Sequence, residues 1–215
     1  MSLGTNKRLM CGVLVLLLVL SLGGGALAKD KVFRMYYTFT NPDPAFVDVT
    51  NYISMMGLFE GLVRFDENFN AVPGVAERWE VSEDGLIYTF YLRQDAKWSN
   101  GDAVTAYDFE YSWKRTMNPA TFGGTPPTFI PSPLNYLKNG MDFMTGKITD
   151  PDVVGIKALD DYILQATLEQ PTPQFIQTCM LYRSFPVHKG IVEKYGKDWA
   201  RFENWVGNGP DRKST

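Results

Sequence analysis

The chain contains a single histidine, His188, and this restricts the catalytic chemistry that its side chains could perform. A Ser-His-Asp or Cys-His nucleophile needs a histidine as its base, and no Gly-x-Ser-x-Gly elbow accompanies this one. His188 follows Pro186 near an expected helix start, so we interpret it as a solvated helix cap. The sequence therefore predicts no catalytic residue and no enzyme, with a secreted hydrolase kept as an alternative function.

Metal and phosphate binding are also weakly supported by the residue types. Zinc normally takes several histidine or cysteine ligands, and the chain has one histidine and two cysteines, Cys11 and Cys179. The glycines at 23–25 lie in an apolar leader, and Gly123-Gly124 precedes prolines instead of the Lys-Ser/Thr start of a phosphate-binding helix. The sequence predicts no metal and no cofactor.

Two carboxylate pairs could in principle bind calcium or hydrolyse a glycosidic bond. They are Asp150 with Asp152 and Asp160 with Asp161. Both pairs fall where turns are expected, and aspartate favours turns because its carboxylate accepts hydrogen bonds from the nearby backbone. We interpret all four as turn residues.

The composition is that of a globular protein without a polyanionic partner. Hydrophobic residues make up 45% of the 215 positions, and 21 Lys and Arg against 24 Asp and Glu give a net charge of -3. The basic residues are scattered along the chain, so no surface is expected to bind nucleic acid.

Residues 1–28 have the pattern of a secretory signal peptide. Lys7 and Arg8 precede an apolar run at 13–22, three glycines, and the small-x-small sequence Ala26-Leu27-Ala28. An uncleaved membrane anchor is the alternative, because the apolar stretch approaches the roughly 20 residues that span a bilayer. Cys11 precedes the apolar run instead of following it, so no lipoprotein signal is predicted. Export to the periplasm would leave Cys179 as a lone cysteine, which we interpret as a buried apolar residue.

The elements after the leader alternate between hairpins and helices. We expect a strand at 32–37, a proline-rich turn at 41–44 and a short helix from residue 51 that Gly61 ends. Hairpins are predicted at 62–72, at 79–92 around Asp84-Gly85, and at 153–168. Helices are predicted at 106–117, 174–181 and 189–195, the last stopped by Gly196.

The helix at 106–117 has the clearest start signal and the clearest core face. Thr105 and Asp108 have the spacing of a capping pair, and Phe109, Trp113 and Met117 recur at helical spacing. The next segment, 118–135, contains too many prolines and glycines for regular structure. A long irregular loop of this kind tends to be functional or mobile.

The region from Leu58 to Arg115 contains a series of motifs in a fixed order: Leu58-Phe59-Glu60-Gly61-Leu62, Pro73-Gly74-Val75-Ala76-Glu77-Arg78-Trp79, Asp84-Gly85-x-x-Tyr88-x-Phe90, Asp95-Ala96-Lys97-Trp98-Ser99 and Asp108-Phe109-x-Tyr111-Ser112-Trp113. With these motifs the region resembles the oligopeptide- and dipeptide-binding proteins of ABC importers, the extracytoplasmic solute-binding proteins of family 5. Gly155-Ile156-Lys157-Ala158-Leu159 and Asn208-Gly209 are similar to the oligopeptide branch.

The resemblance implies an α/β, periplasmic-binding-protein-like fold of type II, with two lobes and an extra subdomain. It assigns 29–57 to the start of lobe one, 58–200 to the extra subdomain and 201–215 to a return into lobe one. Family members continue for several hundred residues, so we expect this chain to be a truncated N-terminal part.

The implied function is capture of extended peptides outside the cytoplasmic membrane and their delivery to a membrane permease. Asp48, Val49, Thr50 and Phe122 are the predicted ligand-binding residues, with ordinary turn or core packing as the alternative for each. A stand-alone binding or scaffold module remains open besides the hydrolase. The fragment alone is expected to bind no peptide usefully, because an incomplete cleft loses most of its desolvated contacts.

Overall fold

The computed structural model describes residues 41–46, 52–127 and 132–210, which lie in one compact unit spanning 37–215. The helices and strands, in chain order, are α2 (Tyr52–Leu58), β1 (Val63–Phe65), β2 (Ala71–Pro73), β3 (Ala76–Val81), β4 (Ile87–Leu92), α3 (Ala106–Met117), α4 (Gly140–Met144), β5 (Ile156–Ala158), β6 (Ile163–Thr167), α5 (Phe175–Thr178) and α6 (Lys189–Tyr195). Short 3-10 turns connect them at η2 (Pro119–Phe122), η3 (Leu134–Tyr136), η4 (Pro151–Val153), η5 (Tyr182–Ser184) and η6 (Gly196–Asp198).

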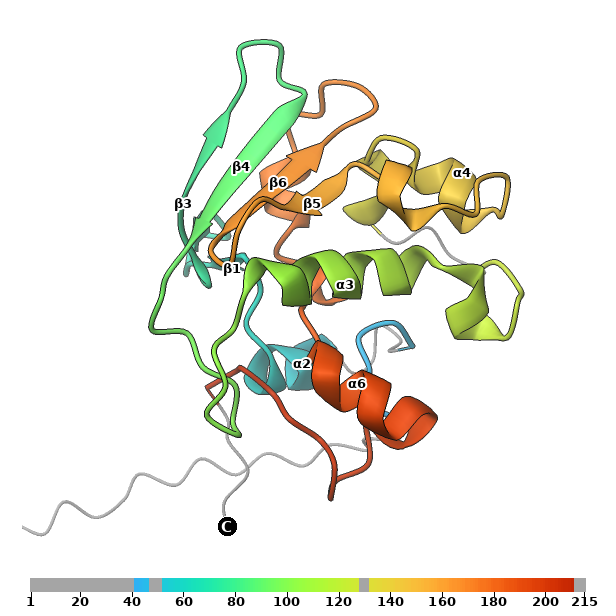
Figure 1. The fold of residues 1–215 in the computed structure, drawn as a ribbon. Helices are drawn as coiled ribbons and strands as arrows, with labels where there is room; N and C mark the ends of the chain where they lie inside the picture. The colour runs from blue at the N-terminus through green and yellow to red at the C-terminus, as the bar shows by residue number, and fades with distance from the viewer. Residues whose placement is uncertain (1–40, 47–51, 128–131, 211–215) are drawn as a thin grey trace, which may run out of the picture. The chain divides into compact units, whose positions relative to one another are not determined.

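The larger of the two described sheets is antiparallel and has four strands in the order β3-β4-β6-β5 (Figure 1). Side chains alternate between its faces: Tyr88, Phe90 and Leu92 of β4 are buried, and Phe90 lies opposite Leu164 of β6. Two of the three predicted hairpins, β3–β4 and β5–β6, supply all four strands.

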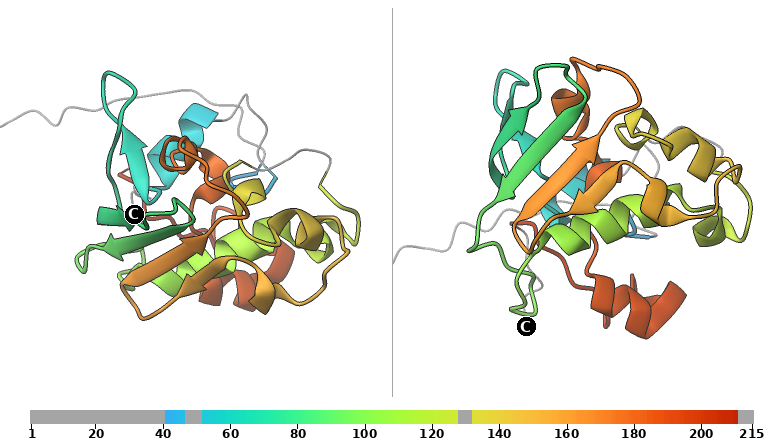
Figure 2. Two further views of the ribbon diagram at one scale, coloured as in Figure 1. Left: turned by 90° about the horizontal axis from the view of Figure 1, so that it is seen from above. Right: turned by 45° about the horizontal axis from the view of Figure 1, so that its top comes forward.

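Helix α3 lies along one face of this sheet, and none of the described helices lies on the opposite face (Figure 2). Its stripe of Phe109, Trp113 and Met117 is completely buried in the core, as the helical spacing predicts. The predicted cap is also present, because Thr105 and Asp108 form a capping box. Asp108 additionally accepts a hydrogen bond from the Trp98 indole at 3.2 Å.

The remaining predicted hairpin forms a separate two-stranded sheet, in which β1 pairs with β2. The helix predicted from residue 51 corresponds to α2, which ends at Leu58 and not at Gly61, and the helix stopped by Gly196 is α6. The helix predicted at 174–181 is shorter, since α5 ends at Thr178 and Leu181, with extended backbone angles, is the N-cap of η5.

The remaining predictions concern Cys179, the segment 118–135 and the N-terminal residues. Cys179 is completely buried, and that burial raises the pKa of its thiol well above the ordinary value. The segment 118–135 contains two 3-10 turns, η2 and η3, where no regular structure was predicted. The predicted strand at 32–37 and signal peptide at 1–28 lie outside the described residues.

A search of the described residues finds no helix whose length and apolar character would let it span a bilayer. The mixture of helices and strands confirms the α/β class. The lobe and subdomain boundaries at 29–57, 58–200 and 201–215 stay predictions.

Candidate functional site

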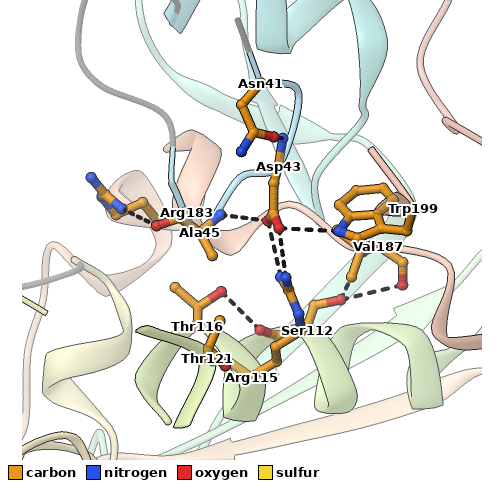
Figure 3. A network of polar contacts seen from close by, with 10 residues as sticks. All are labelled: Asn41, Asp43, Ala45, Ser112, Arg115, Thr116, Thr121, Arg183, Val187 and Trp199. Atoms are coloured by element: carbon orange, nitrogen blue, oxygen red, sulfur yellow. Dashed lines mark hydrogen bonds and ion pairs between the residues drawn. The ribbon is translucent and has the colours of Figure 1, made fainter. Parts of the chain in front are cut away.

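The carboxylate of Asp43 is the centre of a buried polar network that joins the first described segment to α3 and η6 (Figure 3). Both Arg115 Nη atoms donate to it, at 2.9 and 2.5 Å, and the Trp199 indole Nε1 donates at 3.1 Å. A fourth donor is the backbone N–H of Ala45, at 3.0 Å. With 3% of its side chain exposed, Asp43 would be costly to bury without these partners.

The sequence around Asp43 explains the shape of this segment. Its flanking prolines exclude helix, and the Asn41 side chain accepts a hydrogen bond from the Asp43 backbone N–H at 3.0 Å. The Phe46 N–H then donates to the Asp43 carbonyl at 3.0 Å, which closes a turn over 43–46, two residues beyond the turn predicted at 41–44. One aspartate thus shapes the turn and anchors it to the rest of the unit.

The guanidinium of Arg115 is held charged despite its burial. Burial is the largest influence and by itself lowers the pKa of Arg115, but the hydrogen bonds and charge of Asp43 raise it above the ordinary value. The pair is bidentate, which is the strongest arrangement of arginine and carboxylate. Removing either partner would leave the other charge buried and unpaired.

A second set of bonds fixes α3 against the segment that precedes α6. Ser112 Oγ accepts from the Val187 N–H at 2.7 Å, and the Trp113 indole donates to the Ser184 carbonyl at 2.8 Å. Arg183 reaches the other way and donates to the Ala45 carbonyl at 3.2 Å. Residues 41–46 are therefore held on both sides.

The network places two phenylalanines side by side at the edge of the unit. Phe46 and Phe122 have ring centroids 5.1 Å apart, and Phe46 is 46% exposed. Thr121 Oγ1 donates to the Arg115 carbonyl at 2.7 Å and so ties η2 to the end of α3. The predicted ligand residue Phe122 therefore lies beside the segment that leads to residue 47. The other three, Asp48, Val49 and Thr50, lie outside the described residues.

A cavity of about 380 Å³ adjoins the network. Its lining is mostly apolar with a few polar groups, and comes from the first segment, α3, η2, α6 and η6: Asn41, Asp43, Phe46, Arg115, Thr121, Val192, Gly196, Lys197, Trp199 and Ala200. Such a lining is suited to holding a guest by enclosure and a few hydrogen bonds. The sequence did not predict this cavity; around Asp43 it predicted only the turn at 41–44.

A second anchor holds the last described segment. The side-chain amide of Asn208 accepts from the Glu60 N–H at 3.0 Å and donates to the Glu60 carbonyl at 2.9 Å. Gly209 donates its N–H to the Leu58 carbonyl at 3.0 Å, and a Cβ at this glycine would overlap Gly57 and Phe59. The Asn-Gly pair is thus required by close backbone packing on α2.

His188 caps α6 as predicted, but it is not solvated. Its Nδ1 accepts from the Ile191 N–H at 3.3 Å, so Nε2 carries the proton and donates to Asp102 at 2.8 Å. Only 15% of the side chain is exposed, because the ring packs on Trp98 with centroids 5.3 Å apart. Both ring nitrogens are thereby used in structural bonds.

Two of the four predicted turn aspartates, Asp150 and Asp160, are confirmed as such, whereas the Asp152 carboxylate accepts from Lys114 Nζ at 3.1 Å. Asp150 accepts from the Asp152 N–H at 2.9 Å, and Asp160 accepts from the Tyr162 N–H at 2.7 Å. Within the part of the chain that the structure describes, no cluster of three or more His, Cys, Asp or Glu side chains could hold a metal ion.

Comparison with known proteins agrees with the resemblance seen in the motifs. Residues 70–210 match the family described as bacterial extracellular solute-binding proteins, family 5 Middle. This family consists of non-enzymatic solute-binding proteins, in agreement with the prediction that the chain is no enzyme.

The chain is also similar to individual proteins, over most of its own length. The chain is 42% identical over 152 residues to the periplasmic murein peptide-binding protein MppA of Escherichia coli, covering 71% of this chain and 27% of the relative. It is 36% identical over 187 residues to the probable deoxycholate-binding periplasmic protein YgiS of Escherichia coli, covering 85% of this chain and 34% of the relative. The structure of Haemophilus influenzae OppA in complex with RPPGFSPFR matches with a TM-score of 0.72 and 35% identity, over 81% of this chain and 34% of that one.

The chain thus spans about a quarter to a third of the length of these relatives. The match over 70–210 nonetheless covers most of its own residues. The chain belongs to the family 5 bacterial extracellular solute-binding proteins.

Proposed function

We propose that the chain is part of the substrate-binding component of an ABC-type oligopeptide importer. In this role it captures extended peptides in the periplasm and presents them to a membrane permease. The observation that carries the proposal is its similarity, at 35–42% identity, to relatives named or solved as peptide-binding proteins.

The described edge would form one wall of the peptide site. Backbone hydrogen bonds to an extended peptide carry no side-chain information, so pockets beside the backbone accept varied side chains. The exposed ring of Phe46, its neighbour Phe122 and the adjoining Asp48, Val49 and Thr50 are the proposed contacts. The anchored Asp43 supports this role because it fixes where the chain enters residues 47–50.

The opposing wall would come from a second lobe, which belongs to the part of the relatives that this chain does not match. Closure of the two lobes about a hinge would enclose the peptide and create the shape that the permease recognises. We assign 29–57 and 201–215 to lobe one and 58–200 to the extra subdomain. Export would follow from cleavage of the signal peptide at 1–28.

A chimera tests the proposal on a complete cleft. Residues 41–210 of this chain replace the matching part of Haemophilus influenzae OppA, and calorimetry measures binding of RPPGFSPFR. We expect saturable binding of the peptide to the folded chimera. Deoxycholate is titrated as an alternative ligand, because one relative is named for binding it. A chimera with the parent's circular dichroism and a cooperative melt, but with no peptide binding, would count against the proposal.

Matched phenylalanine variants localise the effect. Phe122→Ala in the chimera should weaken peptide binding about threefold to tenfold, the loss expected for one aromatic contact. Phe69→Ala is the control, because Phe69 is 77% exposed in the turn of the β1–β2 hairpin, away from the proposed contacts. Equal affinities for the two variants would remove Phe122 from the site.

A further inference from the structure

We propose that the cavity between residues 41–46, α3 and η6 binds a small organic anion with an aromatic or aliphatic body, such as an arylalkyl carboxylate. This site is formed by side chains of the described chain alone. It goes beyond the importer role and does not depend on a second lobe.

The apolar side of the cavity favours a hydrocarbon group. Phe46, Val192, Trp199 and Ala200 contribute to its lining, and its volume of about 380 Å³ lies within the roughly 300–1,000 Å³ typical of small-molecule sites. Trp199 is held in place by its bond to Asp43 at 3.1 Å. A fixed indole and a half-exposed phenyl ring would contact the guest without first having to be ordered.

The charge of the lining favours an anion. Asp43 is the one carboxylate that contributes to it, and its oxygens already accept from both Arg115 Nη atoms, the Trp199 Nε1 and the Ala45 N–H. The positive charge of Arg115 therefore neutralises the negative charge of Asp43. Lys197 is the second cation of the lining, and among the described residues it has no ion-pair partner. The cavity consequently has an excess of one positive charge.

Asn41 adds a hydrogen-bond donor to the Lys197 ammonium in the lining of the cavity. The Asn41 carbonyl oxygen accepts from the Asp43 N–H, which leaves its amide NH₂ to donate. The Thr121 hydroxyl proton is directed to the Arg115 carbonyl. A carboxylate on the guest would accept from Lys197 and Asn41, whereas an ammonium group would meet a saturated Asp43 and the Lys197 charge.

Fluorine NMR of the chain labelled with 5-fluorotryptophan reports on the cavity directly. The sequence has five tryptophans, and the Trp199→Phe variant assigns the resonance of Trp199. Titration with phenylacetate should shift that resonance saturably and leave the Trp79 signal unchanged. Phenethylamine, which has the same ring and the opposite charge, should cause no saturable shift.

Two lysine variants separate a specific site from general attraction of anions. Lys197→Met should weaken phenylacetate binding about tenfold, the loss of one charge-assisted hydrogen bond. Lys194→Met is the matched control on α6, because Lys194 lies against the Tyr195 ring and outside the lining. Equal weakening by both variants, or no saturable shift of Trp199 with phenylacetate, would overturn the proposal.

A cavity-filling variant gives an independent check. Ala200→Phe places a ring in the cavity and should abolish the phenylacetate response while the other tryptophan resonances keep their positions. Retained binding in this variant would also contradict the proposal. The chimera can fail to bind peptide while this site still binds phenylacetate, so the two proposals fail separately.

Discussion

The two end segments of the described chain are both held to the rest of the unit by side-chain hydrogen bonds, one by a charged pair and the other by a neutral amide. Asp43 holds residues 41–46 through a buried, charged and bidentate pair with Arg115, 72 positions away in the sequence. Asn208 holds the last segment through two neutral hydrogen bonds to the backbone of Glu60, 148 positions away. Beside Asn208, Gly209 allows a backbone contact with α2 that a side chain would block.

The two anchors should therefore respond differently to mutation. A charged anchor is costly to break on one side, because the remaining charge stays buried. A neutral anchor loses less when its side chain is removed, but it depends on the absence of a Cβ next to it. The charged anchor lies beside the proposed ligand edge, where a fixed backbone position matters most.

Removing the charged anchor should have the largest effect on stability. Asp43→Ala leaves the Arg115 guanidinium, 14% exposed, without its partner, and should cost about 3–5 kcal/mol in the free energy of unfolding. Urea denaturation followed by far-ultraviolet circular dichroism measures this value. The control is Asp95→Ala, whose carboxylate is 83% exposed beside Arg93 and should cost less than about 1 kcal/mol. Similar costs for the two variants would show that the Asp43 pair is not an anchor.

Adding a methyl group at the neutral anchor should have the next largest effect. Gly209→Ala forces a Cβ into the backbone of Gly57 and Phe59 and should destabilise the chain by about 1–3 kcal/mol. Gly190→Ala is the opposite control: it lies inside α6, and its nearest neighbour would be the His188 ring at 3.4 Å. That change should stabilise by roughly 0.5–1 kcal/mol. Thermal unfolding of both variants should therefore show shifts of opposite sign.

Removing the neutral side chain should cost less than removing Asp43. Asn208→Ala leaves the Glu60 N–H and carbonyl without their amide partner, for about 1–3 kcal/mol by denaturant unfolding. Asn68→Ala, at an exposed position of the β1–β2 turn, serves as the control and should be nearly neutral. If Asn208→Ala cost as much as Asp43→Ala, the distinction between the anchors would fail.

The smallest expected effect is a pH dependence at the hydrogen bond between His188 and the exposed carboxylate of Asp102. Hydrogen bonds from His188 and then Asn100 hold the pKa of Asp102 below its ordinary value of 3.8. A lowered folded-state pKa adds stability that is fully present above the unfolded-state value and is lost as the pH falls through the folded-state value. Because the Asp102 side chain is 59% exposed, the gain should stay below about 1 kcal/mol. Unfolding measured between pH 2 and pH 5 should show a smaller loss of stability in Asp102→Asn than in the wild type.

The local parts of the fold were predictable from the sequence, and the anchors were not. Thr105 with Asp108, and Asp84 with Gly85, act within a few residues, so their spacing predicts the cap and the turn directly. Asp43 with Arg115, and Asn208 with Glu60, meet only after the chain has folded, and no spacing rule connects them. His188 illustrates the same limit, because its role as a cap is local whereas its burial against Trp98 is tertiary.

Photo-crosslinking tests the central claim, that the edge beside the Asp43 anchor forms part of a peptide-binding wall. A benzophenone-bearing analogue of RPPGFSPFR is irradiated with the chimera, and mass spectrometry of its proteolytic fragments locates the label. The account predicts labelling at residues 46–50 and at Phe122, blocked by excess unlabelled peptide. Specific labelling of the open face of the sheet, at β4 and β6, with none at Phe46 or Phe122, would contradict it.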